Sequence, residues 1–323
     1  MMVKRGSLIL SALFLLGPLM NECAAQGKKL RTIVVDAGHG GEDAGAVGQY
    51  ENSLRSKEKD VTLAIAMKLV AELQKQLPGV KVVPTRTTDV FDDVREKARK
   101  ANEAKGDLFL CIHADSGPLQ NGRRQTGTRM VTRYKISYTG KKKKKIKHST
   151  PYQVEEPVYE YFKMPLKARG TTVYIFSAGK TDLVVNQLVK DQGFSDTEPD
   201  VSDSTVSGFN PNSPEGRQLA QIYMKLYLEK SDRLASFVED EIDATGRPAL
   251  GVNQRAKGIW VLEASHMPAI LVETGYINNP EDERYINSEE GQQEIAEAIT
   301  RAVIRYKKQL ENTKADKSKT DGK

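Results

Sequence analysis

The sequence predicts an α/β fold in which a mostly parallel β-sheet is flanked by helices on both faces. Short, continuous apolar runs, typical of strands buried in a parallel sheet, recur along the chain. Helical patterns separate these runs, which is the alternation expected of an α/β domain. With 323 residues, 38% of them hydrophobic, the chain is long enough to bury a large core.

Five short segments rich in β-branched and aliphatic residues are predicted to be strands. They are Thr32 to Asp36, Lys81 to Val83, Leu108 to Ile112, Thr171 to Phe176 and Ala269 to Glu273. Between the first two, apolar residues recur at every fourth position from Val61 to Leu77 and predict an amphipathic helix that begins near Glu58. Further helices are predicted over residues 92–105, 182–190, 214–241 and 288–310.

Two segments interrupt the alternation of strands and helices. Residues 117–169 combine alternating stretches such as Met130 to Tyr134 with the run Lys141 to Lys145. They are predicted to form an inserted basic lobe or a projecting β-hairpin. The second segment, residues 191–213, is rich in Ser, Asp, Asn and Pro, and is predicted to be a loop.

The N-terminal segment, residues 1–25, is predicted to be a cleaved secretion signal. Lys4 and Arg5 precede an apolar run from Leu8 to Met20, and small residues follow at 23–25. That run is too short to span a bilayer comfortably, and no later stretch is long and apolar enough, so we expect no transmembrane segment. The folded domain is then expected over residues 28–310, outside the cytoplasm, with residues 311–323 as a disordered tail.

Composition and charge exclude several classes of protein. Two Cys in 323 residues exclude a disulfide-stapled mini-fold and a Cys-rich zinc module, so a metal would be held mostly by His and carboxylates. The net charge is +6, but residues 117–169 alone hold 14 Lys and Arg against three Glu. The rest of the chain beyond residue 25 is therefore mildly acidic, and any polyanion partner should be sought at the insertion. The secretion signal argues against nucleic acid as that partner.

Two of the four histidines follow predicted strands at positions where they could meet. His39 stands among glycines after the first strand, and His113 directly follows the run Leu108 to Ile112. Because the carboxyl ends of parallel strands share one edge of a sheet, both imidazoles could reach one metal ion, and Glu58 could add a carboxylate from that edge. A His, Glu, His set with an open position is used by catalytic zinc. His148, beside the Lys run, and His266, in a predicted loop, are poorer candidates.

Glu273 ends the apolar strand that begins at Ala269. A carboxylate after four apolar residues needs a partner, because burying it unpaired is costly. Beside a zinc-bound water it could act as a general base; the alternative is a carboxylate that caps the following turn.

Several motifs occur in an order that identifies a family. They are Val35 to Gly41, Glu58 to Val61, Thr85-Arg86, Asp107 to His113, Gly170 to Tyr174, Leu271 to Ile277 and Asn278 to Glu281. With them the chain resembles the zinc-dependent N-acetylmuramoyl-L-alanine amidases that separate daughter cells, over nearly all of residues 30–116 and 170–310. The resemblance implies one Zn²⁺ per chain on His39, Glu58 and His113, with Glu273 as the catalytic glutamate.

The resemblance also implies partners and a place of action. We expect a periplasmic or otherwise extracytoplasmic monomer that cleaves peptidoglycan between N-acetylmuramic acid and L-alanine. Residues 191–228 lie where some relatives carry an autoinhibitory segment that an activator protein displaces. The basic insertion could bind glycan or an anionic wall component, or be a merely solvated segment. Two alternatives stay open: a zinc peptidase acting elsewhere on the stem peptide, and a wall-binding protein without catalysis.

Overall fold

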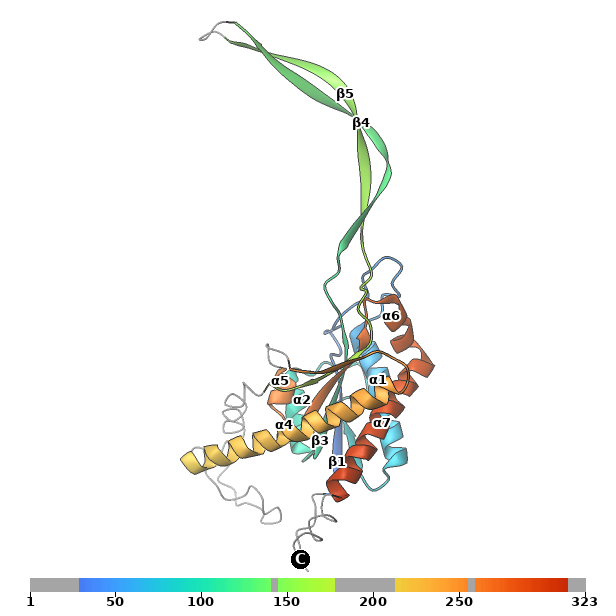
Figure 1. Cartoon of the computed structure of the whole chain (residues 1–323), viewed down its shortest axis with the longest axis vertical. Coiled ribbons are helices and arrows are strands. Elements are labelled where there is room, and N and C mark those ends of the chain that lie inside the picture. Colours follow the sequence, from blue (N-terminus) through green and yellow to red (C-terminus); the bar gives the residue numbers. More distant parts are fainter. Residues whose placement is uncertain (1–28, 141–144, 178–212, 255–258, 313–323) are drawn as a thin grey trace, which may run out of the picture.

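A six-stranded sheet forms the centre of the molecule (Figure 1). The computed structural model describes residues 29–140, 145–177, 213–254 and 259–312. The strands are β1 (Thr32–Ala37), β2 (Lys81–Pro84), β3 (Leu108–Asp115), β6 (Thr171–Ile175), β7 (Ala249–Gln254) and β8 (Ala269–Tyr276), in the order β2-β1-β3-β8-β6-β7. The first four in this order run parallel, whereas β6 is antiparallel to β8 and carries β7 parallel to itself. The predicted mostly parallel sheet is therefore confirmed.

Helices cover both faces of this sheet, as predicted. They are α1 (Glu58–Gln76), α2 (Val94–Glu103), α4 (Pro214–Asp243), α5 (Trp260–Glu263), α6 (Pro280–Asn287) and α7 (Glu289–Asn312). The side chains of Ile33 and Val35 pack in one core cluster with α1, α7 and the C-terminal half of α4. Val34, between them, packs in the other cluster with α2 and α5. This alternation follows from the two-residue period of a strand and places the site-bearing strand ends between two cores.

Three elements were not predicted from the sequence: β7, α5 and α6. Strand β7 is a half-exposed edge strand that contains Gly251 at φ 90°, so it lacks a continuous apolar run. Helix α6 is short and polar, and its signals lie at its start, where Asn279 accepts hydrogen bonds from two backbone N–H groups and Pro280 occupies the first turn.

The segment predicted as a lobe or hairpin forms a long β-hairpin. Strands β4 (Asn121–Thr139) and β5 (Ile146–Lys163) pair in one antiparallel register, with a bulge between Gln125 and Gly127. In Figure 1 the hairpin extends far from the helices and the sheet. The two strands of the hairpin pair with each other, but over most of their length they pack against no other part of the described chain.

Several predictions fall partly or wholly outside the described residues. The signal (1–25), the helix over 182–190 and residues 191–212 lie outside them, whereas 214–228 form the first half of α4. There Met224 is buried in the core, and Ile222 and Leu226 are exposed. Helix α7 continues through Asn312, two residues into the tail expected to be disordered. None of the described helices is long and apolar enough to cross a membrane.

Candidate metal centre

The ends of β1 and β3 place two histidines side by side. The two strands are parallel neighbours, and the N–H of Gly38, just after β1, donates to the carbonyl of Ile112 at 2.9 Å. The chain then turns sharply, because His39 has φ 59° and Gly40 and Gly41 also have positive φ. A positive φ is unfavourable for a residue with a Cβ, so His39 needs other contacts to hold it there. The turn brings its ring centroid to 5.0 Å from that of His113.

Glu58, the first residue of α1, lies between these two imidazoles. Its Oε2 is 3.1 Å from Nε2 of His39, and its Oε1 is 2.8 Å from Nδ1 of His113. The backbone N–H groups of Ala46 and Ala114 donate to the same carboxylate at 2.8 and 3.1 Å. One ligand atom from each of the three side chains lies within 4.8 Å of the others. The structure thus brings together the three residues that the sequence predicts as ligands.

The electrostatics of this group favour positive charge. Burial alone would raise the pKa of Glu58, but hydrogen bonds from His113 and His39, and the positive charge that these rings can carry, hold it well below its ordinary value. Burial would likewise lower the pKa of His39, yet Glu58 and Asp43 raise it to about 9. A group of three side chains that stabilises protons between its ligand atoms is suited to a divalent cation.

The residues around the three donors fit a zinc ion. Asp43 holds Nδ1 of His39 at 2.7 Å, which leaves Nε2 to face Glu58, the carboxylate–histidine arrangement common at metal sites. A Cβ on Gly45 would lie 2.6 Å from the His39 ring and 2.7 Å from Glu58 Oε2, and a Cβ on Gly38 would lie 2.6 Å from the His113 ring. Glycine is therefore required at both positions, and the donor set is the one that catalytic zinc uses.

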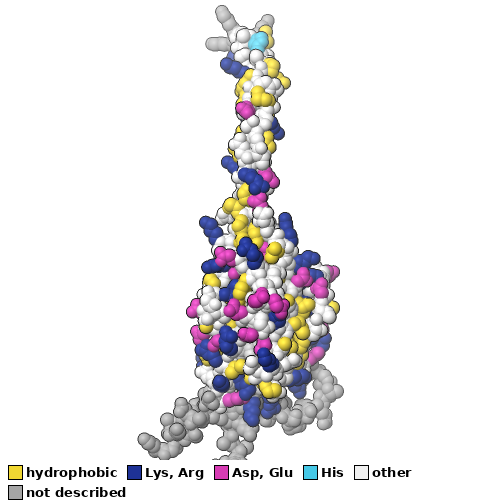
Figure 2. All heavy atoms as spheres, turned by 90° about the vertical axis from the view of Figure 1, so that its right-hand side faces the viewer, with side chains coloured by type: hydrophobic (Ala, Val, Ile, Leu, Met, Phe, Trp, Pro, Cys, Tyr) yellow, Lys and Arg dark blue, Asp and Glu magenta, His cyan; other side chains and the backbone are white. Residues whose placement is uncertain are grey.

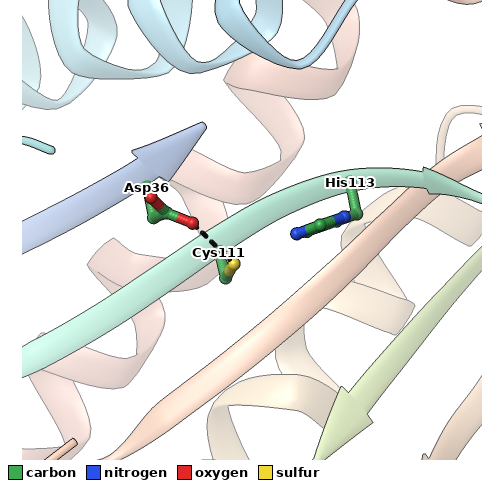
Figure 3. A group of neighbouring side chains, drawn as sticks. All are labelled: Asp36, Cys111 and His113. Carbon is green, nitrogen blue, oxygen red and sulfur yellow. Dashed lines mark hydrogen bonds between the residues drawn. The ribbon is translucent and has the colours of Figure 1, made fainter. Parts of the chain in front are cut away.

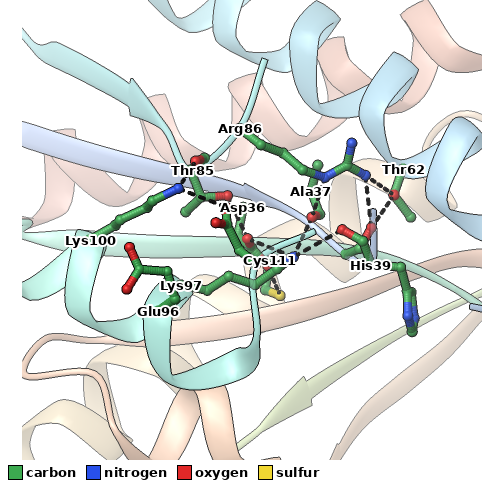
Figure 4. A network of polar contacts seen from close by, with 12 residues as sticks. Asp36, Ala37, His39, Thr62, Thr85, Arg86, Glu96, Lys97, Lys100 and Cys111 are labelled. Carbon is green, nitrogen blue, oxygen red and sulfur yellow. Dashed lines mark hydrogen bonds and ion pairs between the residues drawn. The ribbon is translucent and has the colours of Figure 1, made fainter. Parts of the chain in front are cut away.

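Buried polar side chains hold the turn that carries His39 (Figure 4). Arg86 donates from Nε to the carbonyl of Ala37 at 3.1 Å and from an Nη to that of Gly38 at 2.9 Å. Thr62 donates to the Gly38 carbonyl at 2.7 Å. From α2, Lys97 donates to the Ala37 carbonyl at 2.5 Å and pairs with Asp36 at 3.1 Å. The motif Thr85-Arg86 is visible in the sequence, but these contacts are not.

Glu273 lies beside this group in the sheet. It is the register partner of His113 across the β3–β8 pair, so both side chains project to the same face, and Glu273 is only 5% exposed. The hydroxyl of Thr274 donates to the His113 carbonyl at 2.9 Å and joins the two strands there. The arrangement offers a buried carboxylate next to the three predicted ligands.

A second group with metal-ligand atoms lies deeper, formed by Asp36, Cys111 and His113 (Figure 3). Its members already have partners: Asp36 accepts from Thr85 at 2.5 Å and from the Cys111 thiol at 2.9 Å, besides pairing with Lys97. Burial raises the pKa of the Cys111 thiol well above its ordinary value, so it stays protonated. Within the described chain, the group of His39, Glu58 and His113 is therefore the better metal centre. His148 lies at the far end of the hairpin.

The chain is similar to known proteins over most of its length. A family model described as N-acetylmuramoyl-L-alanine amidase matches residues 33–305. The chain is 28% identical over 276 residues to the N-acetylmuramoyl-L-alanine amidase AmiC of Escherichia coli O6:H1, covering 85% of this chain and 52% of that protein. It is 27% identical over 294 residues to the N-acetylmuramoyl-L-alanine amidase AmiA of Escherichia coli K12, covering 90% and 80%. The chain thus spans about half the length of AmiC.

The fold also matches solved structures. An N-acetylmuramoyl-L-alanine amidase from Clostridium difficile 630 aligns with a TM-score of 0.51 and 21% identity, covering 86% of this chain and 97% of that one. Another, from Mycobacterium smegmatis, aligns with a TM-score of 0.50 and 18% identity over 86% and 97%. These two structures support the arrangement of the sheet and its helices.

Proposed function

The chain belongs to the N-acetylmuramoyl-L-alanine amidase family, and from this we propose that it hydrolyses the amide bond between N-acetylmuramic acid and L-alanine in peptidoglycan. The observation that carries the proposal is the convergence of His39, Glu58 and His113 at one edge of the sheet, with Glu273 in register beside His113. This is the arrangement that metal-assisted hydrolysis requires: ligands with an open position and a nearby base.

We propose that His39, Glu58 and His113 hold one zinc ion. When bound, zinc supplies Lewis acidity, which makes a water molecule acidic near neutral pH and polarises a carbonyl. Three residues position His39. Asp43 binds Nδ1 of its ring, and the buried cations Arg86 and Lys97 donate to the carbonyls of the turn that precedes it. The raised pKa of His39 in the metal-free protein means that zinc must displace a proton from this side chain when it binds.

Glu273 acts as the general base and then as the general acid. It takes a proton from water as the oxygen adds to the lactyl carbonyl of N-acetylmuramic acid, and returns it to the nitrogen of L-alanine as the C–N bond breaks. The products are a lactyl carboxylate on the glycan and a stem peptide with a free amine. The buried position of Glu273 limits its contact with bulk water, which suits a group that must carry one proton between two partners.

The cellular role is proposed from the family resemblance. We propose that the chain acts outside the cytoplasm, in the periplasm, after a signal over residues 1–25 is removed, and that it serves cell-wall remodelling and daughter-cell separation. The segment 191–228 is proposed to be autoinhibitory and to respond to an activator protein. Removing residues 194–212 tests this: higher activity of the shortened chain supports autoinhibition, and unchanged activity contradicts it.

The proposed reaction is tested on purified sacculi with zinc-loaded protein. We expect new alanine amino groups to appear among the released peptides, none with Glu273→Gln, and zinc bound in a 1:1 ratio to both proteins. The Glu273→Gln control separates catalysis from folding, because it keeps the side chain's size and leaves the three ligands in place. Zinc-independent release of the same amines, or no release by the zinc-loaded chain that lacks residues 194–212, contradicts the proposal.

A further inference from the structure

One face of the β4–β5 hairpin carries exposed apolar side chains that no described part of the chain covers. Side chains alternate between the two faces of a ribbon, so Met130, Tyr134, Ile136 and Tyr138 share a face. Their side chains are 64%, 62%, 50% and 59% exposed. We call these four residues the apolar face of the hairpin. A two-stranded ribbon with such a face is marginally stable in water by itself, which indicates a partner.

Charge along the hairpin is distributed unevenly. Near the body, acidic residues neutralise the basic ones: Arg124 pairs with Glu160 at 2.9 Å, and Arg129 and Arg133 pair with Glu156. Between Tyr134 and Val154 the sequence has no Asp or Glu, and the described Lys135, Lys145 and Lys147 lie in this outer part. Figure 2 shows basic and hydrophobic side chains together along the hairpin. The outer part is therefore both cationic and apolar.

We propose that the outer hairpin binds an anionic membrane surface, with its apolar face in the boundary between headgroups and acyl chains. Basic residues are attracted to anionic headgroups, apolar side chains enter the boundary region, and tyrosine favours that depth. Tyr134 and Tyr138 flank Ile136 on the apolar face, while Lys147 lies opposite Tyr138 on β5 and can reach the headgroups. An anionic membrane surface thus accounts for both the positive charge and the exposed apolar side chains of the outer hairpin.

Two other possible partners of the hairpin would each account for only one of these two properties. A second copy of the chain could cover the apolar face, but residues 121–163 contain 12 Lys and Arg against three Glu, so two hairpins repel each other. A soluble polyanion could neutralise the lysines, but it would leave Ile136 and Met130 in water. The membrane proposal is also independent of the proposed amidase activity, because the hairpin projects away from the sheet and the helices that carry the candidate metal centre (Figure 1).

The test uses the full chain and lipid vesicles. Sedimentation with phosphatidylcholine vesicles is compared with sedimentation with vesicles that also contain phosphatidylglycerol. We expect binding to the anionic vesicles only. The double variant Lys135→Gln/Lys147→Gln should bind roughly 30-fold more weakly, since each basic residue near an anionic surface contributes roughly fivefold to the affinity. Ile136→Ser/Tyr138→Ser should weaken binding at least about tenfold through lost apolar burial.

Matched controls separate this site from general effects of charge and folding. Tyr161→Ser changes a tyrosine that is 70% exposed near the base of the hairpin, and should leave vesicle binding unchanged. In Tyr138→Trp, anionic vesicles should shift the new tryptophan's emission to the blue, whereas Trp260 in the body should not respond. All variants should keep the circular dichroism spectrum and the activity of the unaltered chain.

Three results would overturn the proposal. The first is equal binding of the unaltered chain to neutral and anionic vesicles, or no binding to either. The second is binding to anionic vesicles that Ile136→Ser/Tyr138→Ser leaves unchanged and that soluble polyphosphate fully competes away, which would identify a polyanion site. The third is a concentration-dependent dimer that the same double variant abolishes, which would identify a second copy as the occupant.

Discussion

Replacing Lys97 with methionine takes a buried ammonium away from Asp36 while keeping most of the apolar stem. The exposed fractions of the two side chains are 4% and 1%, and the ion pair spans 3.1 Å. The pKa of Asp36 is lowered because Lys97 and hydrogen bonds from Cys111 and Thr85 outweigh its burial. Removing one partner of such a pair leaves an uncompensated charge, which costs about 3–5 kcal/mol of unfolding free energy.

The assay is urea unfolding at neutral pH, combined with zinc affinity measured by competition with a chelator. Lys97→Met should lose about 3–5 kcal/mol and bind zinc more weakly, because Lys97 also donates to the Ala37 carbonyl in the turn before His39. The loss of unfolding free energy should be smaller in acid, because protonation of Asp36 removes the unpaired charge. In the unaltered chain at neutral pH, Asp36 is ionised and stabilises the fold through its ion pair with Lys97. This stability is lost as the pH falls through the lowered pKa of Asp36.

Two variants make the reasoning refutable. Asp36→Leu/Lys97→Met removes both charges and should be more stable than Lys97→Met alone. Lys100→Met is the matched control: the Lys100 side chain is 34% exposed and its ammonium pairs with Asp92 at 2.7 Å, so its loss should cost about 1 kcal/mol or less. A loss below about 1 kcal/mol for Lys97→Met, or a double variant less stable than the single one, refutes the account of this buried pair.

Three further predictions concern the site and its supports. Asp43→Asn should weaken zinc binding by about 10- to 100-fold, measured by chelator competition, since the carboxylate orients His39. Gly45→Ala should abolish stoichiometric zinc binding, seen by metal analysis, because its Cβ would crowd His39 and Glu58. Glu283→Gln should flatten the acid limb of thermal stability, because the lowered pKa of Glu283 contributes stability above its unfolded pKa that is lost as the pH falls through its folded pKa. Full zinc occupancy in Gly45→Ala, or an unchanged acid limb in Glu283→Gln, would contradict the respective argument.

The parts of the fold that bury continuous apolar runs were predictable from the sequence. Strands β1, β3 and β8 and helix α1 fall within a few residues of their predicted bounds, because each buries side chains with the period of its own structure. Strand β7 was not predictable in this way. It lies at the sheet edge, half exposed, and its identity depends on pairing with β6, which is a tertiary contact.

The site shows the same division between local and tertiary information. His39 and His113 were predictable because strand ends meet at one edge of a parallel sheet, and Glu58 because it begins the helix that follows. The supporting residues were not. Glu283, in α6, accepts hydrogen bonds from Tyr50 and Ser56 in the loop before Glu58, more than two hundred residues earlier in the chain. Such contacts leave no periodic signal in the sequence.

Isotope labelling of the cleaved bond tests the central claim most directly. Zinc-loaded protein is incubated with purified sacculi in ¹⁸O-water, and the products are analysed by mass spectrometry, with Glu273→Ala as the control. We predict ¹⁸O in the lactyl carboxylate of N-acetylmuramic acid, unlabelled stem peptides that begin with a free L-alanine amine, and no label with Glu273→Ala. Label in a carboxylate of the stem peptide, with the lactyl amide intact, would contradict the amidase assignment and identify a peptidase.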